Sequence, residues 1–180
     1  DDGIDVFHDI DSVLADDYRD PIATGIKGLD EVMNGGLSKG ELAVILAAFG
    51  VGKTTMMTKI ANTALLNGKR VVQIFFEDMP KVVQRKHLSC WTGHPLNDLG
   101  LHKEEIKELA SEMIAKSKDG KGSLTLKKFS SDGTTMPMIK TYLRKLIAQG
   151  FRPDIVLLDY IDCVVPSKHY DDVNVGEGAI

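Results

Sequence analysis

The chain has 180 residues, enough for one domain with a sizeable core, and a formal net charge of −4. The charge is uneven, because residues 1–20 contain eight Asp and one Arg, a net charge of −7, which leaves +3 for residues 21–180. This balance argues against a strongly basic nucleic-acid module, but it says little about any single face of the molecule.

Residues 5–18 place apolar side chains at helical spacing between aspartates, which predicts a short acidic amphipathic helix that ends before Asp20-Pro21. We interpret residues 1–20 as a linker helix or arm and residues 21–180 as the main domain. The pattern leaves open whether the helix docks on a neighbouring subunit or packs on its own domain. Because the chain does not begin with Met and stops at Ile180, we expect a fragment, incomplete at its C-terminus.

Apolar runs alternate with helical patterns along the main domain. Strands are expected at residues 42–46, 70–76, 123–129 and 155–159, and helices at about 28–33, 53–67, 81–91, 103–117 and 135–149. Such alternation predicts an α/β fold in which helices flank a mostly parallel sheet with right-handed crossovers.

The junction between the first strand and the first long helix has the features of a phosphate-binding loop. A small-residue turn leads into Gly52-Lys53-Thr54, so that backbone N–H groups and a helix N-terminus form an anion site. We expect Lys53 to reach the β- and γ-phosphates of a nucleotide and the Thr54 hydroxyl to hold Mg²⁺. The usual spacing puts Gly where this chain has Ala47. The predicted nucleotide-binding residues are Gly50, Val51, Gly52, Lys53, Thr54 and Thr55.

Acidic residues follow two of the predicted strands, at the sheet edge where α/β proteins place their chemistry. Asp159 ends an apolar strand, and we expect it to hold the Mg²⁺ shell. Glu77 and Asp78 follow the second strand, and only one of them should face the γ-phosphate because adjacent strand residues point to opposite sides. We favour Glu77 as the catalytic base that orients the attacking water, with Asp78 as the alternative.

Several short motifs together resemble the RecA-like ATPase core over roughly residues 22–165. Within that group the chain looks like the DnaB-type replicative helicases, especially those of tailed phages. The motifs are Thr24-Gly25, Gly28-Leu29-Asp30, Gly35-Gly36-Leu37, Gly40-Glu41-Leu42, the loop Ala47 to Thr55, Met79-Pro80 and Leu158-Asp159-Tyr160. The chain departs from many relatives in its Glu77-Asp78 order.

The resemblance implies an ATP-hydrolysing DNA helicase motor that uses Mg²⁺ and works as a hexameric ring, 5′ to 3′, on single-stranded DNA. Lys53 and Glu77 would be catalytic, and Thr54 and Asp159 would hold the metal. A primase or a helicase loader is a further possible partner, and the bacterial or phage-infected host cytoplasm is the implied location. The arginine finger and a glutamine-bearing strand would lie outside this chain, so we expect the fragment alone to be inactive.

Two rival functions share the same core. One is a RecA-like recombinase that forms filaments, and the other is a regulatory ATPase that switches shape without unwinding DNA. Lys168 and Tyr170 are candidates for DNA contacts, but Asp171 and Asp172 offset the basic charge, and a mobile surface loop explains them equally well.

The remaining features bear on compartment and metal content. Cys90 and Cys163 are far apart and apolar-flanked, which is consistent with a reducing compartment. Cys90 and His94 are close in sequence, but no further ligand lies near them in the chain, so we expect no metal site there. No run approaches the roughly 18 apolar residues of a membrane span, and no signal peptide is visible.

Overall fold

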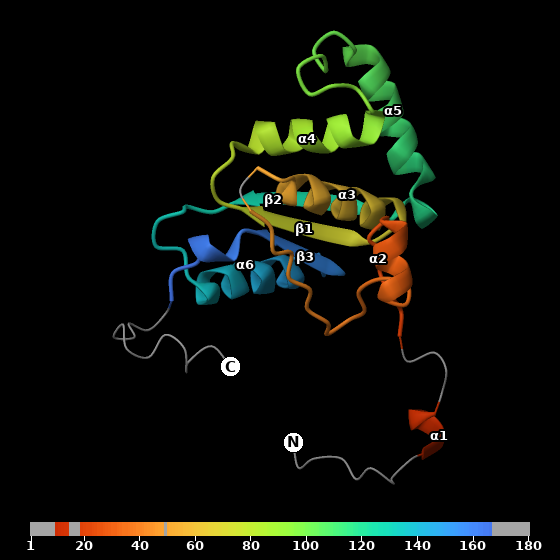
Figure 1. The fold of residues 1–180 in the computed structure, drawn as a ribbon, viewed down its shortest axis with the longest axis vertical. Helices are drawn as coiled ribbons and strands as arrows, with labels where there is room; N and C mark the ends of the chain where they lie inside the picture. Colours follow the sequence, from red (N-terminus) through yellow and green to blue (C-terminus); the bar gives the residue numbers. More distant parts are fainter. Residues whose placement is uncertain (1–9, 15–18, 49, 167–180) are drawn as a thin grey trace.

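The computed structural model describes residues 10–14, 19–48 and 50–166. A parallel sheet with the strand order β2-β1-β3 is formed by β1 (Arg70–Phe75), β2 (Ser123–Lys128) and β3 (Ile155–Asp159). Two helices, α3 (Lys53–Leu66) and α4 (Pro80–Thr92), lie on one side of the sheet, and α6 (Met136–Ala148) covers the other (Figure 1). The predicted α/β architecture with a parallel sheet is therefore confirmed.

The other elements surround this layered core. They are α1 (Ile10–Val13), α2 (Lys27–Val32), α5 (Lys103–Lys116) and two short 3₁₀ turns at Lys118–Gly120 and Ile161–Cys163. Each helix and strand begins and ends within a few residues of its predicted bounds, apart from the first strand and the N-terminal helix. Of the helix predicted over residues 5–18, the structure describes residues 10–14, which contain α1, and the rest lies outside the described residues.

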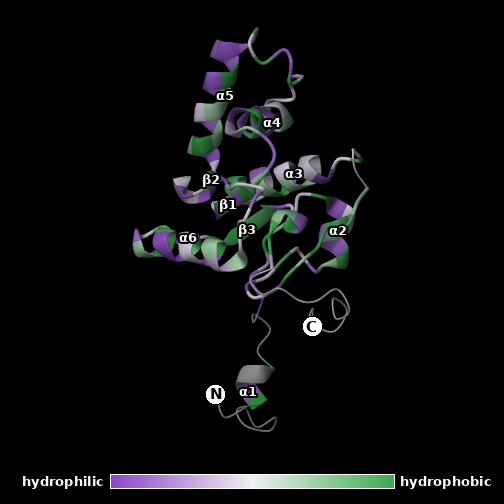
Figure 2. Cartoon of the chain, turned by 90° about the vertical axis from the view of Figure 1, so that its left-hand side faces the viewer, coloured by the Kyte–Doolittle hydropathy of each residue, from purple (hydrophilic) through white to green (hydrophobic). Residues whose placement is uncertain are grey.

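The central strand β1 determines how the two faces of the sheet are filled. Its side chains alternate, so that Val71 packs with α3 and Leu157 on one face, whereas Val72 and Ile74 pack with Ile139 of α6 on the other. The neighbouring strand β3 is mostly green in Figure 2, as expected for a strand of a parallel sheet that is covered by helices. Burial on both faces explains why β1 has apolar residues pointing both ways (Val71, Val72, Ile74 and Phe75), with Gln73 as a buried polar exception.

Some apolar residues of the helices are exposed. Ile114 of α5 is 57% exposed, and Met138 and Ile147 of α6 are each 49% exposed. Helical periodicity identifies a stripe of apolar residues, but only the part of the stripe that meets a neighbouring element is buried.

The prediction of a strand at residues 42–46 is wrong. Residues 41–48 form no ladder, and Leu42, Val44 and Leu46 are 88%, 77% and 96% exposed. Only the alternate residue Ile45 packs against the core. An apolar run becomes a strand only where another strand pairs with its backbone, and residues 41–48 pair with none of the three strands.

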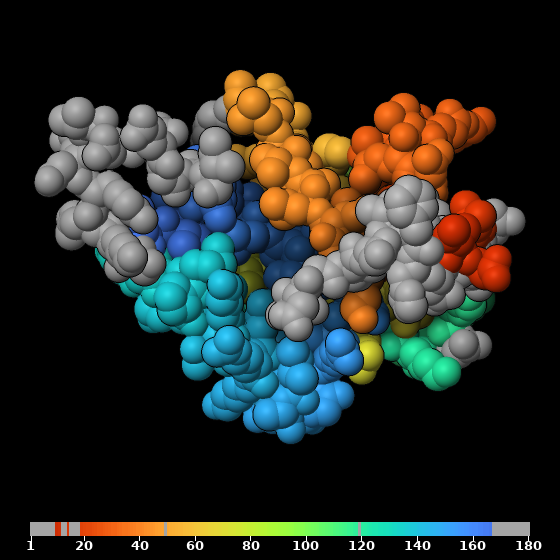
Figure 3. Space-filling view, turned by 90° about the horizontal axis from the view of Figure 1, so that it is seen from below, coloured from red at the N-terminus to blue at the C-terminus, as the bar shows by residue number. Residues whose placement is uncertain are grey.

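The outer edge of β3 is a free edge of the sheet among the described residues. Among the described residues β3 pairs with β1 alone, and residues 41–48 do not pair with its outer edge. Figure 3 shows blue atoms of the chain around β3 between the orange segment that precedes α3 and the light-blue α6. Within residues 42–46 only Ile45 is partly buried, and the segment forms no strand hydrogen bonds.

A buried polar network joins α3, α4 and β1. The His87 ring lies between two amide side chains, with Nδ1 2.8 Å from Asn62 Oδ1 and Nε2 2.8 Å from Gln73 Oε1. Asn62 Nδ2 donates to the His87 carbonyl at 3.1 Å, which fixes the orientation of that amide, so His87 Nδ1 is the donor. The neutral ring then needs a donor at Nε2, which the Gln73 amide supplies when its NH₂ group, otherwise unpaired among the described residues, faces His87.

Burial lowers the pKa of His87 to about 4, so its imidazole is neutral in the folded protein at pH 7. In the unfolded chain the ring regains its ordinary pKa of about 6.5 and therefore binds more protons than the folded chain between pH 6.5 and pH 4. The free energy of unfolding should fall by about 2–3 kcal/mol as the pH falls through this window, and the loss should level off below it. Urea unfolding of the wild type and His87→Gln from pH 7.5 to pH 4 checks this: the stability gap between them narrows on acidification. A constant gap would contradict the neutral buried imidazole.

Two further sequence predictions concern DNA contacts and membrane spans. Lys168 and Tyr170, the candidate DNA contacts, lie outside them. No helix in the described part of the chain combines the length and the apolar character needed to cross a membrane.

Candidate functional site

The carboxyl ends of β1 and β3 meet the N-terminus of α3. Phe75, the last residue of β1, is in register with Asp159, the last residue of β3, so the segments that follow both strands emerge at one edge of the sheet. The polar residues predicted from the sequence follow these two strand ends or begin α3. Parallel pairing therefore brings together residues that are far apart in the chain.

The loop before α3 has the backbone of an anion site. Gly50 and Gly52 adopt φ angles of 81° and 101°, in the left-handed region that favours glycine, and α3 begins directly after Gly52. The first N–H groups of a helix have no intrahelical acceptor, so they are available to a bound anion. Lys53 and Thr54 of this first turn are half-buried, whereas Val51 and Thr55 are exposed.

The two predicted metal-holding residues are in direct contact. Thr54 Oγ1 donates a hydrogen bond to Asp159 Oδ2 at 2.7 Å, although the residues are 105 positions apart in the chain. Mg²⁺ binds oxygen ligands at 2.0–2.1 Å in an octahedron, where neighbouring ligand oxygens lie about 2.9 Å apart. The separation of the Thr54 and Asp159 oxygens therefore fits adjacent positions around one Mg²⁺ ion.

Glu77 and Asp78, which the sequence left as alternatives, have different partners. The Asp78 carboxylate forms an ion pair with Lys86 of α4 at 2.5 Å. The Glu77 side chain instead accepts a hydrogen bond from the Tyr160 hydroxyl at 3.1 Å, and its backbone carbonyl accepts one from Lys128 Nζ at 3.0 Å. Glu77 therefore faces the residues after β3, whereas Asp78 is tied to α4.

Tyr160 connects the two halves of the site, and sequence reasoning did not assign it a place there. Its ring lies beneath Lys53, with Nζ 4.5 Å from the ring centroid, while its hydroxyl contacts Glu77. Hydrogen bonds with Cys163 and then with Glu77, together with the charges of both groups, raise the pKa of Tyr160 to about 12, so the hydroxyl keeps its proton at neutral pH. In the sequence, the only indication of this role was that Tyr160 directly follows Asp159. In the structure the peptide bond between these two residues is cis.

Comparisons with known proteins show which proteins the chain is similar to. The family described as DnaB-like helicase C terminal domain matches residues 21–177. The replicative DNA helicase DnaB of Helicobacter pylori is 27% identical over 147 residues, which cover 82% of this chain and 30% of that protein. The match therefore extends well beyond the phosphate-binding loop.

Shorter matches link the chain to other proteins. The DNA repair and recombination protein RadB of Thermococcus gammatolerans is 40% identical over 53 residues, 29% of this chain and 23% of that protein. The circadian clock oscillator protein KaiC of Acaryochloris marina is 29% identical over 68 residues, 38% of this chain and 13% of that protein. In each case the matched segment spans less than a third of the relative.

Proposed function

We propose that this chain, which belongs to the DnaB-like helicase C-terminal domain family, is the ATP-hydrolysing motor domain of a replicative DNA helicase. Its fold is the RecA-like α/β core of that family. The observation that carries the proposal is the Thr54–Asp159 contact at 2.7 Å, which puts both candidate Mg²⁺ ligands beside the phosphate-binding loop. The match to a replicative helicase along most of the chain favours the motor over the recombinase and clock proteins, whose matches are short.

In this proposal each side chain has a defined task in ATP hydrolysis. The backbone N–H groups from Gly50 to Thr55 cradle the phosphates, and the Lys53 ammonium contacts the β- and γ-phosphates. Thr54 and Asp159 would hold Mg²⁺, which neutralises charge on the phosphate oxygens. Glu77 orients the attacking water and accepts its proton. The Tyr160 hydroxyl, which remains protonated, holds the Glu77 carboxylate toward the loop.

The proposal extends to the assembled protein. We place the site at the interface of a hexameric ring in which ATP hydrolysis shifts neighbouring subunits and moves single-stranded DNA. The test is the ATP turnover of the assembled protein with and without single-stranded DNA, together with images of its oligomers. Closed rings with DNA-stimulated turnover support the motor. Open filaments would favour a recombinase. Rings whose ATP turnover is the same with and without single-stranded DNA would favour a regulatory ATPase.

Two substitutions at Tyr160 should separate its contacts. Tyr160→Phe keeps the ring beneath Lys53 and removes the hydrogen bond to Glu77, so turnover should fall by about 3- to 10-fold with little change in ATP affinity. Tyr160→Ala also removes the ring, and ATP affinity should then fall by about 2- to 5-fold as well. Steady-state kinetics and nucleotide titrations measure both quantities. Equal effects of the two substitutions on turnover and affinity would contradict separate roles for ring and hydroxyl.

A further inference from the structure

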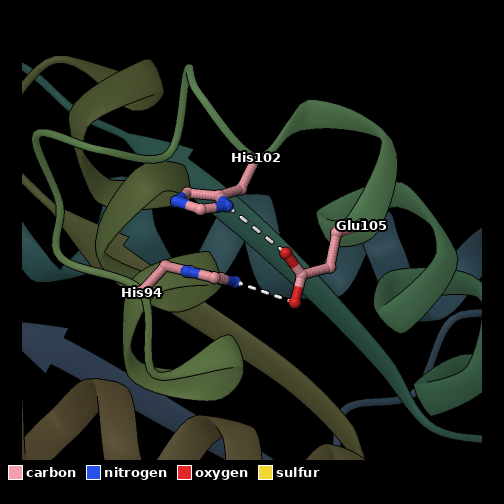
Figure 4. Close-up of side chains that lie close together, drawn as sticks. All are labelled: His94, His102 and Glu105. Carbon is pink, nitrogen blue, oxygen red and sulfur yellow. Dashed lines mark ion pairs between the residues drawn. The ribbon is translucent and has the colours of Figure 1, made fainter.

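Three side chains of metal-ligand type meet where α4 is joined to α5 (Figure 4). His94 follows Gly93 at the end of α4, His102 directly precedes α5, and Glu105 lies in the first turn of α5. Figure 1 places this junction on the side of α4 away from the sheet, so the group is separate from the proposed ATP site. The sequence prediction of no metal site near His94 considered only neighbours in the chain.

The carboxylate of Glu105 contacts both imidazole rings. One oxygen lies 3.3 Å from His94 Nε2 and the other lies 3.3 Å from His102 Nδ1. The ligand atoms of the three residues all lie within 4.8 Å of one another. In a tetrahedral zinc site with bonds of 2.0–2.1 Å, neighbouring ligand atoms lie about 3.3–3.4 Å apart. Each nitrogen–oxygen separation has the length of one edge of such a tetrahedron. The two separations involve different oxygens of Glu105, so a carboxylate that binds through one oxygen must rotate to bring that oxygen close to both nitrogens.

The backbone that carries these ligands is held in place by its own contacts. Ser89 Oγ donates to the His94 carbonyl at 2.7 Å, Arg85 donates to the Leu96 carbonyl at 2.7 Å, and Leu99 is buried at 5% exposure. The rings themselves are stacked, with centroids 4.1 Å apart and an angle of 19° between their planes. Binding one ion requires them to tilt about their Cβ–Cγ bonds, and this torsion is broad for histidine.

We propose that His94 Nε2, His102 Nδ1 and the Glu105 carboxylate bind a divalent transition-metal ion, with Zn²⁺ as the preferred ion. Two neutral imidazoles and one carboxylate suit zinc and cobalt better than Mg²⁺, which prefers oxygen ligands. Three protein ligands leave a fourth position for water, and the side chains of His102 and Glu105 are 40% and 56% exposed, so solvent reaches the ion. The bound ion links the end of α4 to the start of α5.

The proposal is tested by titrating the metal-free chain with Co²⁺ and following the visible d–d absorption, then displacing Co²⁺ with Zn²⁺. One equivalent should bind, with the intense bands of a low-coordinate nitrogen and oxygen site. Thermal unfolding should shift upward by about 5–10 °C when free Zn²⁺ reaches about 100 times its Kd. Absence of saturable binding would overturn the proposal, and the histidines and Glu105 would then form only a hydrogen-bonded cluster.

Variants identify the ligands. Glu105→Gln and His102→Asn should each weaken binding by about 100-fold or more, since loss of a ligand exceeds the 10- to 100-fold effect of residues that only orient ligands. Glu104→Gln is the matched control, because Glu104 lies in the same turn but pairs with Lys107 at 2.7 Å. It should bind like the wild type, and weakening equal to that of Glu105→Gln would contradict the ligand set.

Cys90 provides a second control, because it is an exposed free thiol on α4 near His94 in the chain. Cys90→Ser should leave the metal affinity and the cobalt spectrum unchanged. A thiolate-to-cobalt absorption band in the wild type, or loss of binding in Cys90→Ser, would place the site on Cys90 and overturn the proposed ligands. Circular dichroism of each variant separates lost binding from lost folding.

Discussion

Replacing Lys53 by Ala should weaken Mg²⁺-ATP binding to the chain by about 10- to 100-fold, because the ammonium supplies charge-assisted hydrogen bonds to the phosphates. Lys53 is the first residue of α3 and is half-buried, with its Nζ held over the Tyr160 ring at 4.5 Å. The side chain is thus kept at the loop rather than free in solvent. A fluorescent-nucleotide titration or calorimetry measures the affinity directly, without requiring turnover by an assembled ring.

The matched control for this prediction is Lys59→Ala. Lys59 lies on the same helix and is exposed, so its removal changes the net charge equally without touching the loop. Lys59→Ala should keep the wild-type affinity within about 2-fold, because an exposed charge of this kind is largely screened by salt. If both variants lost affinity equally, the effect would come from net charge and not from a phosphate contact by Lys53.

The second large effect is expected at Glu77. Glu77→Gln should lower ATP turnover of the assembled protein by about 10²- to 10⁴-fold, the usual contribution of a general base, while ATP affinity is retained. The amide keeps the shape of the side chain and an oxygen that accepts the Tyr160 hydrogen bond, so the local structure is preserved. Single-turnover hydrolysis at saturating ATP separates the chemical step from binding.

Asp78→Asn tests the alternative base. This substitution removes the ion pair with Lys86 and should change turnover by less than about 10-fold, because the carboxylate is engaged with α4. A greater loss in Asp78→Asn than in Glu77→Gln would reverse the assignment. Comparing the two neighbours is informative because both substitutions remove one negative charge, whereas the two carboxylates have different partners, Tyr160 and Lys86.

The local pattern of the sequence predicted most of the elements. The bounds of β1, β2, β3 and the helices from α3 to α6 follow from apolar periodicity and from turn residues, which act over a few positions. The same local reasoning selected Lys53, Thr54, Glu77 and Asp159 as candidates, because a strand end or a helix start is where such side chains carry chemistry. Their roles remain predictions that the variants above test.

Pairing between distant segments could not be predicted in this way. Residues 42–46 are as apolar as a strand, yet they form no ladder, because a strand depends on a partner edge and not only on its own residues. The spacing of Leu42, Val44 and Leu46 predicts which residues would share a face of a strand, but not which part of the protein that face would contact.

The sequence by itself therefore determined the class of fold and the kinds of side chain at the site, since both depend on short-range pattern. Tertiary structure alone decided which of these side chains meet. It brought Thr54 into contact with Asp159. It gave Glu77 and Asp78 different partners, Tyr160 and Lys86. It also brought together three side chains at the α4–α5 junction, namely those of His94, His102 and Glu105. Each of these contacts depends on the packing of separate elements, which no local pattern specifies.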